Sequence, residues 1–319
     1  MRVLIIKLGA LGDFVQAFAA FRQIREAHAE DEITLLTTPP YADLAQASGL
    51  FDRIETDGRP KGLTQAVKLF GRLRAARYDR IYDLQTSSRS KLFFYAFLPF
   101  PPQWSGISPG ASHRQTRPDR DAMHNLDRMA DQLHVAGIGP AYPPGEAPAP
   151  DLSWALAAPG CEPHALMEHL GVKAPFAILA PGASTVKPEK LWPIEFYAEL
   201  AQRLEQAGLQ VVVAGGPGES ALYTLIAARA PSAVDLTGRT TLVQLAAVGT
   251  QARLCVGNDS GPTHLLAYAG APGLMLMSGV SDPAHCGPRA RMASLRAEDL
   301  RALKVDTVLT ACLHALAAT

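Results

Sequence analysis

Short apolar runs alternate with longer amphipathic segments along most of the chain. Five runs in the first half have the length and hydrophobicity of buried parallel strands, and the segments between them repeat apolar positions at helical spacing. The predicted strands are residues 2–7, 32–37, 53–56, 79–84 and 103–107, and the predicted helices are residues 13–28, 63–76, 90–98 and 122–136. Strands separated by such helices predict right-handed βαβ units and a doubly wound sheet.

The alternation stops at residues 140–150, where five prolines fall within eleven residues. Such a density of proline continues neither a helix nor a central strand, so this stretch predicts a connector. The alternation then resumes, with strands at 176–180, 209–214, 273–277 and around Leu254, and with helices at 193–207, 218–230 and 241–248. The pattern predicts an α/β fold of two doubly wound, Rossmann-like domains, residues 1–158 and 159–304, facing a central cleft.

Composition narrows the class of protein. The 319 residues suffice for two cores, and 30 basic residues balance 30 acidic ones. Residues 1–150 carry 18 Lys or Arg against 16 Asp or Glu, which argues against general nucleic-acid binding. The four cysteines stand far apart, which disfavours a disulfide framework or a structural zinc site. With neither a signal-peptide pattern nor an apolar run of membrane-spanning length, we expect a cytoplasmic or peripheral protein.

Residues 256–264, Val-Gly-Asn-Asp-Ser-Gly-Pro-Thr-His, link a predicted buried strand to a short apolar helix. A strand that turns into a helix leaves unpaired N–H groups and the positive end of the helix dipole at the carboxyl edge of the sheet, where phosphate groups bind. Pro262 suits the first helical turn. Asp259 can accept hydrogen bonds from ligand hydroxyls, and His264 lies close by. The alternative is that Asp259 or Ser260 only caps the helix.

A second motif, Lys7-Leu-Gly-Ala-Leu-Gly-Asp13, follows the first predicted strand. Its two glycines stand three apart, so the spacing of a dinucleotide fingerprint is missing, and a nicotinamide-dependent dehydrogenase is disfavoured. Asp13 is expected at the start of a helix. It either complements the helix dipole or offers a carboxylate that takes a proton from a hydroxyl.

Two further turns follow strands of the second half. The loop Pro-Gly-Ala-Ser184-Thr185, followed by Lys190-Leu-Trp-Pro, combines hydroxyls, N–H groups and a cation, which suits a phosphate. Taken one at a time, Ser184 and Thr185 are better explained by turn chemistry and Lys190 by a solvated loop. The turn Gly-Gly-Pro-Gly-Glu219 places Glu219 in the first turn of a helix, where it binds a ribose or complements the dipole.

These four stretches, in this order, resemble glycosyltransferase family 9, which contains the ADP-heptose:lipopolysaccharide heptosyltransferases. The resemblance covers nearly the whole chain. It implies a GT-B fold with an N-terminal acceptor domain, a C-terminal donor domain and a last helix, residues 305–319, that can cross back to the first domain. It also implies inverting transfer of a sugar, most often heptose from ADP-heptose, to a lipopolysaccharide core or related glycan, with neither cofactor nor metal.

The resemblance assigns roles to individual residues. It implies Asp13 as general base, with Lys190 stabilising the leaving group. The implied donor-binding residues are Ser184, Thr185, Lys190, Glu219, Thr240, Asp259, Ser260, Gly261 and His264. The candidate acceptor-binding residues are Lys7, Gly9, Ala10, Gly12, Arg89, Arg117 and Arg120. Asp119 and Asp121 form a D-x-D pair, which we interpret as a helix cap because a predicted helix follows it.

The mechanism expected from these roles needs no divalent metal, because a lysine and a helix N-terminus face the diphosphate. Domain closure would then exclude water. The competing classes are a nucleotide-sugar epimerase or hydrolase and a non-catalytic nucleotide-sugar binding protein. Residues 92–100, the most aromatic stretch, predict either a buried helix followed by a turn or a surface that meets lipid, and a lipid-linked acceptor favours peripheral contact with the inner membrane.

Overall fold

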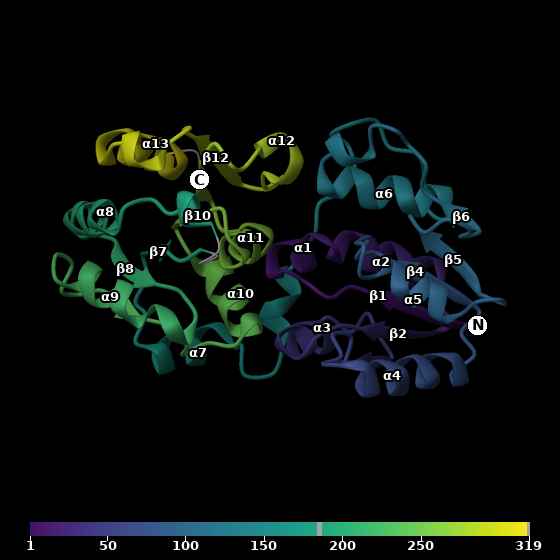
Figure 1. Cartoon of the computed structure of the whole chain (residues 1–319). Coiled ribbons are helices and arrows are strands. Elements are labelled where there is room, and N and C mark those ends of the chain that lie inside the picture. The colour runs from purple at the N-terminus through teal and green to yellow at the C-terminus, as the bar shows by residue number, and fades with distance from the viewer. Residues whose placement is uncertain (184–186, 318–319) are drawn as a thin grey trace. The chain divides into compact units, whose positions relative to one another are not determined.

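Two parallel six-stranded sheets, each with flanking helices, make up the computed structural model, which describes residues 1–183 and 187–317 (Figure 1). The chain divides into two units, Met1–Pro150 and Asp151–Thr319. The sequence places this division after residue 158, whereas the structure places it at the end of the proline-rich connector. The expected α/β fold of doubly wound, Rossmann-like units is confirmed.

The first sheet has the strand order β3-β2-β1-β4-β5-β6. Its strands are β1 (Arg2–Ile6), β2 (Glu32–Leu36), β3 (Arg53–Glu55), β4 (Arg80–Asp83), β5 (Gln103–Gly106) and β6 (His113–Arg114). Its helices are α1 (Leu11–Gln16), α2 (Phe18–Ala27), α3 (Ala42–Ala47), α4 (Leu63–Ala75), α5 (Lys91–Ala96) and α6 (Asn125–Val135). The two-residue β6 and the short α3 have too few residues for a periodic signal, so the sequence pattern did not predict them.

The second sheet has the order β12-β11-β10-β7-β8-β9. Its strands are β7 (Phe176–Ala180), β8 (Gln210–Val213), β9 (Val234–Asp235), β10 (Leu254–Asn258), β11 (Gly273–Met277) and β12 (Met292–Arg296). Its helices are α7 (Pro163–Leu170), α8 (Ile194–Gln206), α9 (Ser220–Ala227), α10 (Leu242–Gln251), α11 (Gly261–Tyr268), α12 (Pro283–Cys286) and α13 (Val305–Ala317). The edge strand β12 is largely exposed, which hides it from a search for apolar runs.

Both sheets reverse their strand order at one place. The reversal lies between β1 and β4 in the first sheet and between β7 and β10 in the second. Ligands of open α/β sheets bind outside the carboxyl ends of the strands at such a switch point. The four motifs of the sequence follow β1, β7, β8 and β10, so three of them lie at a switch point and the fourth lies beside one.

Apolar side chains from strands and helices fill the two cores. In the first unit, Phe94 and Phe97 of the α5 region contact Trp104 of β5 edge-to-face, with ring centroids 5.2 and 5.8 Å apart. In the second unit, Val305, Val308 and Cys312 of α13 join the core beneath α8, β10 and β11. The helix therefore packs within its own unit, and its return to the first unit stays a prediction.

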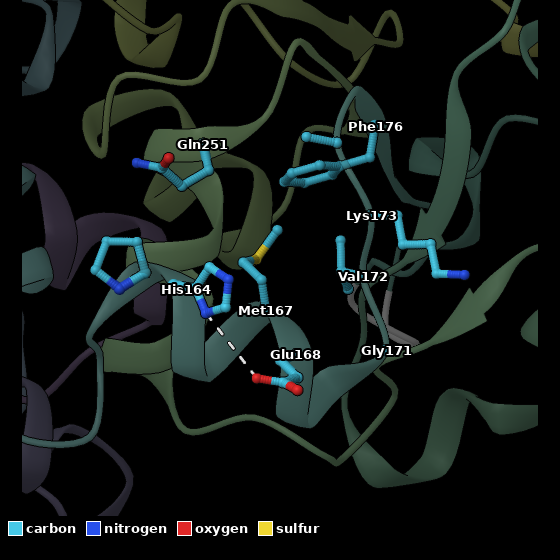
Figure 2. Close-up of a pocket in the computed structure, with 10 residues that line it drawn as sticks. His164, Met167, Glu168, Gly171, Val172, Lys173, Phe176 and Gln251 are labelled. Carbon is cyan, nitrogen blue, oxygen red and sulfur yellow. Dashed lines mark ion pairs between the residues drawn. The ribbon is translucent and has the colours of Figure 1, made fainter.

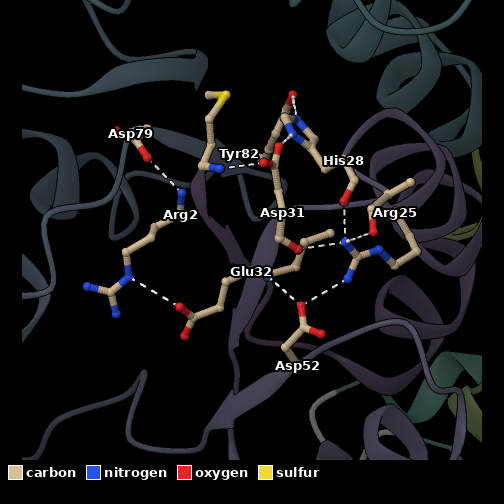
Figure 3. Close-up of polar contacts among 11 residues, drawn as sticks. Arg2, Arg25, His28, Asp31, Glu32, Asp52, Asp79 and Tyr82 are labelled. Atoms are coloured by element: carbon tan, nitrogen blue, oxygen red, sulfur yellow. Dashed lines mark hydrogen bonds and ion pairs between the residues drawn. The ribbon is translucent and has the colours of Figure 1, made fainter.

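Ion pairs and hydrogen bonds close the amino edge of the first sheet (Figure 3). Arg25 pairs with Asp52 at 2.9 Å, and His28 bridges Asp31 at 2.7 Å and the Tyr82 hydroxyl at 2.9 Å. The hydrogen bonds of Asp31 to the terminal amine and to His28 lower the pKa of that carboxyl. Polar groups at this edge thus bond with one another, and the motif residues lie at the opposite, carboxyl edge.

The glycine of β10 permits close packing at the switch point. A Cβ on Gly257 would overlap Thr263 Oγ1 of α11 and lie 2.9 Å from Ala180 Cβ of β7. Gly257→Ala should therefore lower the free energy of unfolding by about 1–3 kcal/mol in urea denaturation, because both neighbours are buried and leave no room for a methyl group.

Gly71→Ala provides the matched control. Gly71 lies within α4, and nothing would lie within 4 Å of its added Cβ. Alanine there should stabilise the helix by up to about 1 kcal/mol. A Gly257→Ala protein as stable as the wild type would contradict the close approach of α11 to β10.

Candidate active site

Asp259 follows β10 at the switch point of the second sheet and collects three hydrogen bonds. Its carboxylate accepts from Lys190 Nζ at 2.5 Å, from Ser281 Oγ at 2.5 Å and from His264 Nε2 at 3.3 Å. These donors come from the turn η4 (Pro188–Lys190), from the loop after β11 and from α11. The structure thus brings together the predicted residues Lys190, Asp259 and His264, and it adds Ser281.

The donors keep Asp259 charged although only 6% of it is exposed. Burial alone would raise its pKa, but the hydrogen bonds from His264, Lys190 and Ser281 outweigh burial and hold the pKa of Asp259 well below its ordinary value. The carboxylate in turn fixes the Lys190 ammonium at the carboxyl edge. That bond uses one of the three N–H donors of Lys190, so the cation keeps donors for a further anion.

The N-terminus of α11 lies directly beside this cluster. Ser260 occupies the N-cap position, but its side chain does not cap the helix, and its hydroxyl instead bonds Thr263 Oγ1 at 3.0 Å. The interpretation of Asp259 or Ser260 as a cap is therefore wrong. Pro262 lies in the first turn as predicted. The first turn, from Gly261, thus presents N–H groups that the Ser260 side chain does not cap, together with the positive end of the dipole.

Asn258, the last residue of β10, holds the Lys190 loop at both ends. Its Oδ1 accepts from the Trp192 N–H at 3.1 Å and from the Tyr197 hydroxyl at 3.2 Å, while its Nδ2 donates to the Pro181 carbonyl at 2.7 Å. Sequence reasoning did not assign Asn258 a role, because periodicity does not show that a polar residue ending a buried strand points inward. The predicted residues Ser184 and Thr185 lie outside the described residues.

Glu219 bonds within its own turn. Its carboxylate accepts the Gly216 N–H at 2.6 Å, and a Cβ on Gly182 or Gly215 would overlap it or crowd it. The turn after β8 and the loop after β7 therefore meet at Glu219. The ribose contact implied for Glu219 stays a prediction, as does the base contact of Thr240, which is partly exposed. The turn that contains Thr240 lies beside the turn of Glu219, because the Gly238 N–H donates to the Gly215 carbonyl at 2.9 Å.

Asp13 lies in a polar pocket of about 40 Å³ at the switch point of the first sheet. It is exposed in the first turn of α1, where Asn125 Nδ2 donates to Asp13 Oδ1 at 3.4 Å. Arg128 Nη2 donates to Asn125 Oδ1 at 2.6 Å, which directs the amide N–H groups of Asn125 toward Asp13. Asn125 and Arg128 of α6 were not predicted, because their distance from Asp13 in the sequence hides this contact.

Three cations surround the Asp13 pocket. Lys7 is buried and donates from Nζ to the Leu84 carbonyl at 3.0 Å, and burial lowers the pKa of Lys7 while Asp13 opposes that change. Burial and the neighbouring Arg120 lower the pKa of Arg128. Arg120 is fixed by Gln115 and by Thr86, each at 2.7 Å. Of these cations, Arg120 also pairs with Asp121 at 2.8 Å, and the three together suit a substrate that carries an anionic group.

The other predicted acceptor residues lie outside that pocket's lining. Gly9 has φ +98°, and a Cβ there would overlap the Tyr41 ring, so the turn requires glycine. Ala10 is the N-cap of α1 and Gly12 lies in its first turn. Arg117 pairs with Asp119 and Asp131, and Arg89 is exposed.

The D-x-D pair does not cap a helix. Asp119 bonds Arg117 at 2.6 Å and Asp121 bonds Arg120 at 2.8 Å, and His124 caps α6 instead, accepting the Leu126 N–H. The cap prediction is therefore wrong, because α6 begins at Asn125 after a 3₁₀ turn. Within residues 1–183 and 187–317, no three His, Cys, Asp or Glu side chains are grouped so as to hold a metal ion.

A larger hollow of about 660 Å³ lies at the amino edge of the second sheet (Figure 2). It is formed by α7, the start of β7 and the end of α10, and its lining includes Met167, Val172 and Lys173. His164 and Glu168 at its rim pair at 3.9 Å, and both are almost fully exposed. None of the predicted site residues that the structure describes lines this hollow.

Asp83, at the carboxyl end of β4, is fully buried behind the Asp13 pocket. Its Oδ1 accepts the N–H groups of Gln85 and Thr86 at 3.1 and 3.0 Å, which shapes the loop that lines the pocket. Burial raises the pKa of Asp83 to about 6 despite these bonds. Ionisation of Asp83 therefore costs folding free energy as the pH rises from its ordinary pKa through about 6.

Asp83→Asn should stabilise the protein in a pH-dependent way, because Asn keeps the Oδ1 acceptor without the charge. The gain in free energy of unfolding should reach about 3 kcal/mol above pH 6 and vanish as the pH falls toward about 4. Urea denaturation across this range measures it, with the exposed Asp43→Asn as control. A gain that does not change with pH would contradict the buried charge.

Comparison with known proteins agrees with this arrangement. The family model described as glycosyltransferase family 9 (heptosyltransferase) matches residues 66–298. The lipopolysaccharide core heptosyltransferase OpsX of Haemophilus influenzae is 24% identical over 284 residues, covering 84% of this chain and 76% of the relative. Lipopolysaccharide heptosyltransferase 2 of Escherichia coli K12 is 28% identical over 317 residues, covering 92% and 87%.

Solved structures share the fold. A glycosyl transferase family 9 protein from Veillonella parvula superposes with a TM-score of 0.82 at 20% identity, covering 100% of this chain and 97% of the other. Escherichia coli ADP-heptose lps heptosyltransferase II gives 0.81 at 21% identity, with coverage of 100% and 99%. The fold is thus of the GT-B type expected from the sequence. The family match spans most of the chain, and the protein is therefore a glycosyltransferase that belongs to glycosyltransferase family 9.

Proposed function

We propose that the protein transfers heptose from ADP-heptose to a lipopolysaccharide core acceptor, with inversion and without a metal. The observation that carries the proposal is the Asp259 cluster, which holds the Lys190 cation next to the N-terminus of α11, where the Ser260 side chain makes no cap. A pyrophosphate placed there meets a positive charge and free N–H donors. The choice of heptose as the sugar and of lipopolysaccharide as the acceptor rests on relatives that are named lipopolysaccharide heptosyltransferases.

The proposed reaction is a single displacement. The acceptor oxygen attacks the anomeric carbon of the donor while the bond from that carbon to the phosphate oxygen breaks. The electron pair of this bond leaves with ADP, and the proton of the acceptor hydroxyl passes to Asp13. Lys190 and the helix N-terminus stabilise the charge that develops on the diphosphate. Asn125 orients the Asp13 carboxylate, and Lys7, Arg120 and Arg128 bind an anionic group of the acceptor.

Asp13→Asn should lower kcat by about 10²- to 10⁴-fold and leave ADP affinity within about twofold of the wild type, because Asp13 acts on the acceptor only. Transfer is measured as ADP release from ADP-heptose in the presence of heptose-deficient lipopolysaccharide, and ADP affinity is measured by calorimetry. Asp43→Asn is the matched control, since Asp43 also lies in the first turn of a helix.

Two outcomes would contradict this role. Equal loss of activity in Asp13→Asn and Asp43→Asn would mean that both carboxylates act on helix stability. ADP release by the wild type at the same rate without acceptor would indicate a hydrolase, and conversion of the donor to another sugar nucleotide an epimerase. If the wild type binds ADP-heptose and turns over neither with nor without acceptor, a binding protein is indicated.

Lys190→Ala should weaken ADP binding by about 10- to 100-fold, because a charge-assisted hydrogen bond to the diphosphate is lost. The change also leaves Asp259 buried without its cation, so the melting temperature of the variant without ligand is measured to check that it is folded. Lys190→Arg keeps the charge and should recover part of the ADP affinity. Lys173→Ala is the control for the hollow of Figure 2. ADP affinity that depends on Lys173 instead of Lys190 would place the nucleotide at the amino edge.

We further propose that the protein works in the cytoplasm, in peripheral contact with the inner membrane, since a lipopolysaccharide acceptor is anchored in lipid. Within the described residues, no helix is both long and apolar enough to cross a bilayer. A surface contact is therefore the form of membrane association that the helices of the described chain support.

A further inference from the structure

The aromatic stretch at residues 92–100 divides between core and surface. Phe93, Phe94 and Phe97 are buried against Trp104, as the interpretation of a buried helix predicts. Leu92, Tyr95, Leu98 and Phe100 are exposed, and Phe100 shows 87% of its surface. The helix α5 thus buries one apolar face and exposes another, which a helix serving only the core would not need.

The neighbouring helix α4 repeats this arrangement. Leu69 and Leu73 are buried, whereas Leu63 and Val67, one turn apart, are 80% and 61% exposed. Both helices belong to crossovers that run in the same direction along the sheet, so the right-handed rule places them on the same face.

Direct contacts join α4 to α5. The rings of Phe70 and Phe93 meet edge-to-face at 5.3 Å, and Arg74 Nη1 donates to the carbonyls of Ala96 and Leu98 at 3.0 and 3.3 Å. Positions 63, 67, 70 and 74 follow the spacing of one helix face, so Leu63 and Val67 lie on the same side of α4 as Phe70 and Arg74, which contact the α5 region. We name the exposed apolar residues of the pair the α4–α5 face: Leu63, Val67, Leu92, Tyr95, Leu98 and Phe100.

The charge around the α4–α5 face is mainly positive. Residues 58–102 contain nine Lys or Arg but only two acidic residues, Asp79 and Asp83. Asp83 is buried, and Asp79 accepts the Arg2 N–H at 2.7 Å. Arg72 pairs with Glu55 and Asp57.

Most of the remaining cations are free to meet a partner. The side chains of six of them form neither an ion pair nor a hydrogen bond with any residue in the part of the chain that the structure describes, and five of these six are exposed: Arg59, Lys61, Lys68, Arg77, Arg89 and, partly buried, Lys91. The overall charge of the protein is zero, so this excess is local.

We propose that the α4–α5 face docks on an anionic lipid bilayer, its apolar side chains entering the headgroup region and its cations meeting lipid phosphates. Exposed apolar residues among cations are the composition of an interfacial membrane surface, whereas a protein partner would require no such excess of one charge. The proposal deepens the proposed action on a lipid-anchored acceptor. Its test uses vesicles without sugar, so the two proposals can fail separately.

Vesicle co-sedimentation of the full-length protein provides the test. Wild type should bind vesicles of phosphatidylcholine mixed with phosphatidylglycerol, bind phosphatidylcholine alone much more weakly, and be released by salt. The triple variant Lys61→Gln, Lys68→Gln, Arg77→Gln should lose about 100-fold in partitioning, since each cation contributes about fivefold. The double variant Leu63→Ser, Phe100→Ser should lose at least about tenfold.

Matched variants of the second unit control for loss of charge and loss of apolar surface. One variant removes three exposed cations by the changes Lys173→Gln, Arg229→Gln and Arg291→Gln. The other removes two half-exposed leucines by the changes Leu225→Ser and Leu313→Ser. Both should bind within about twofold of the wild type. Leu92→Ser, Tyr95→Ser serves as a second apolar variant, and unchanged melting temperatures show that each variant is folded.

Four results would overturn the proposal. Three concern the vesicles: absence of binding to the anionic vesicles, equal binding to phosphatidylcholine alone, and unchanged binding by the α4–α5 variants. The fourth is a dimer, detected by sedimentation velocity, that dissociates in the double variant Leu63→Ser, Phe100→Ser. The last result would mean that a second copy of the chain covers the α4–α5 face.

Discussion

A buried carboxylate at the end of β10 determines the arrangement of the second unit's carboxyl edge. Asp259 can remain charged in the interior only because Lys190, His264 and Ser281 donate to it, and each donor reaches it from a different segment of the chain. Removing the charge from water is costly, so the three segments are held where they satisfy it. The same contacts fix a cation beside the N-terminus of α11, which is the physical requirement for binding a diphosphate.

The first unit meets a different requirement at the equivalent switch point. There the carboxylate of Asp13 is exposed and the buried groups are cationic or set back from the surface, as with Lys7 and Asp83. An exposed carboxylate can accept a proton, and the cations close to it can bind an anionic substrate. In the proposed reaction the two units thus apply one topology to opposite tasks, since one would stabilise negative charge on a leaving group and the other would receive a proton.

The surface of the first unit shows why burial must be known residue by residue. α4 and α5 each bury one apolar face, which any crossover helix does, but they also expose a second one among unpaired cations. From the sequence, the stretch at 92–100 supported either a core or a surface role. The structure shows that part of the stretch is buried and part is exposed, because the side chains of a helix point in several directions within a single turn.

The sequence by itself determined the order of most strands and helices, the doubly wound class of both units and the four turns at the carboxyl edges, because buried strands and amphipathic helices leave periodic signals and glycine-rich turns mark where they end. Only the tertiary structure decided which polar side chains meet: Ser281 with Asp259, Asn258 with both ends of the Lys190 loop, and Asn125 and Arg128 with Asp13. It also decided against the caps expected of Asp259 and Asp119. Such contacts join residues far apart in the chain, and hydrogen bonding depends on distance and direction, which periodicity does not record.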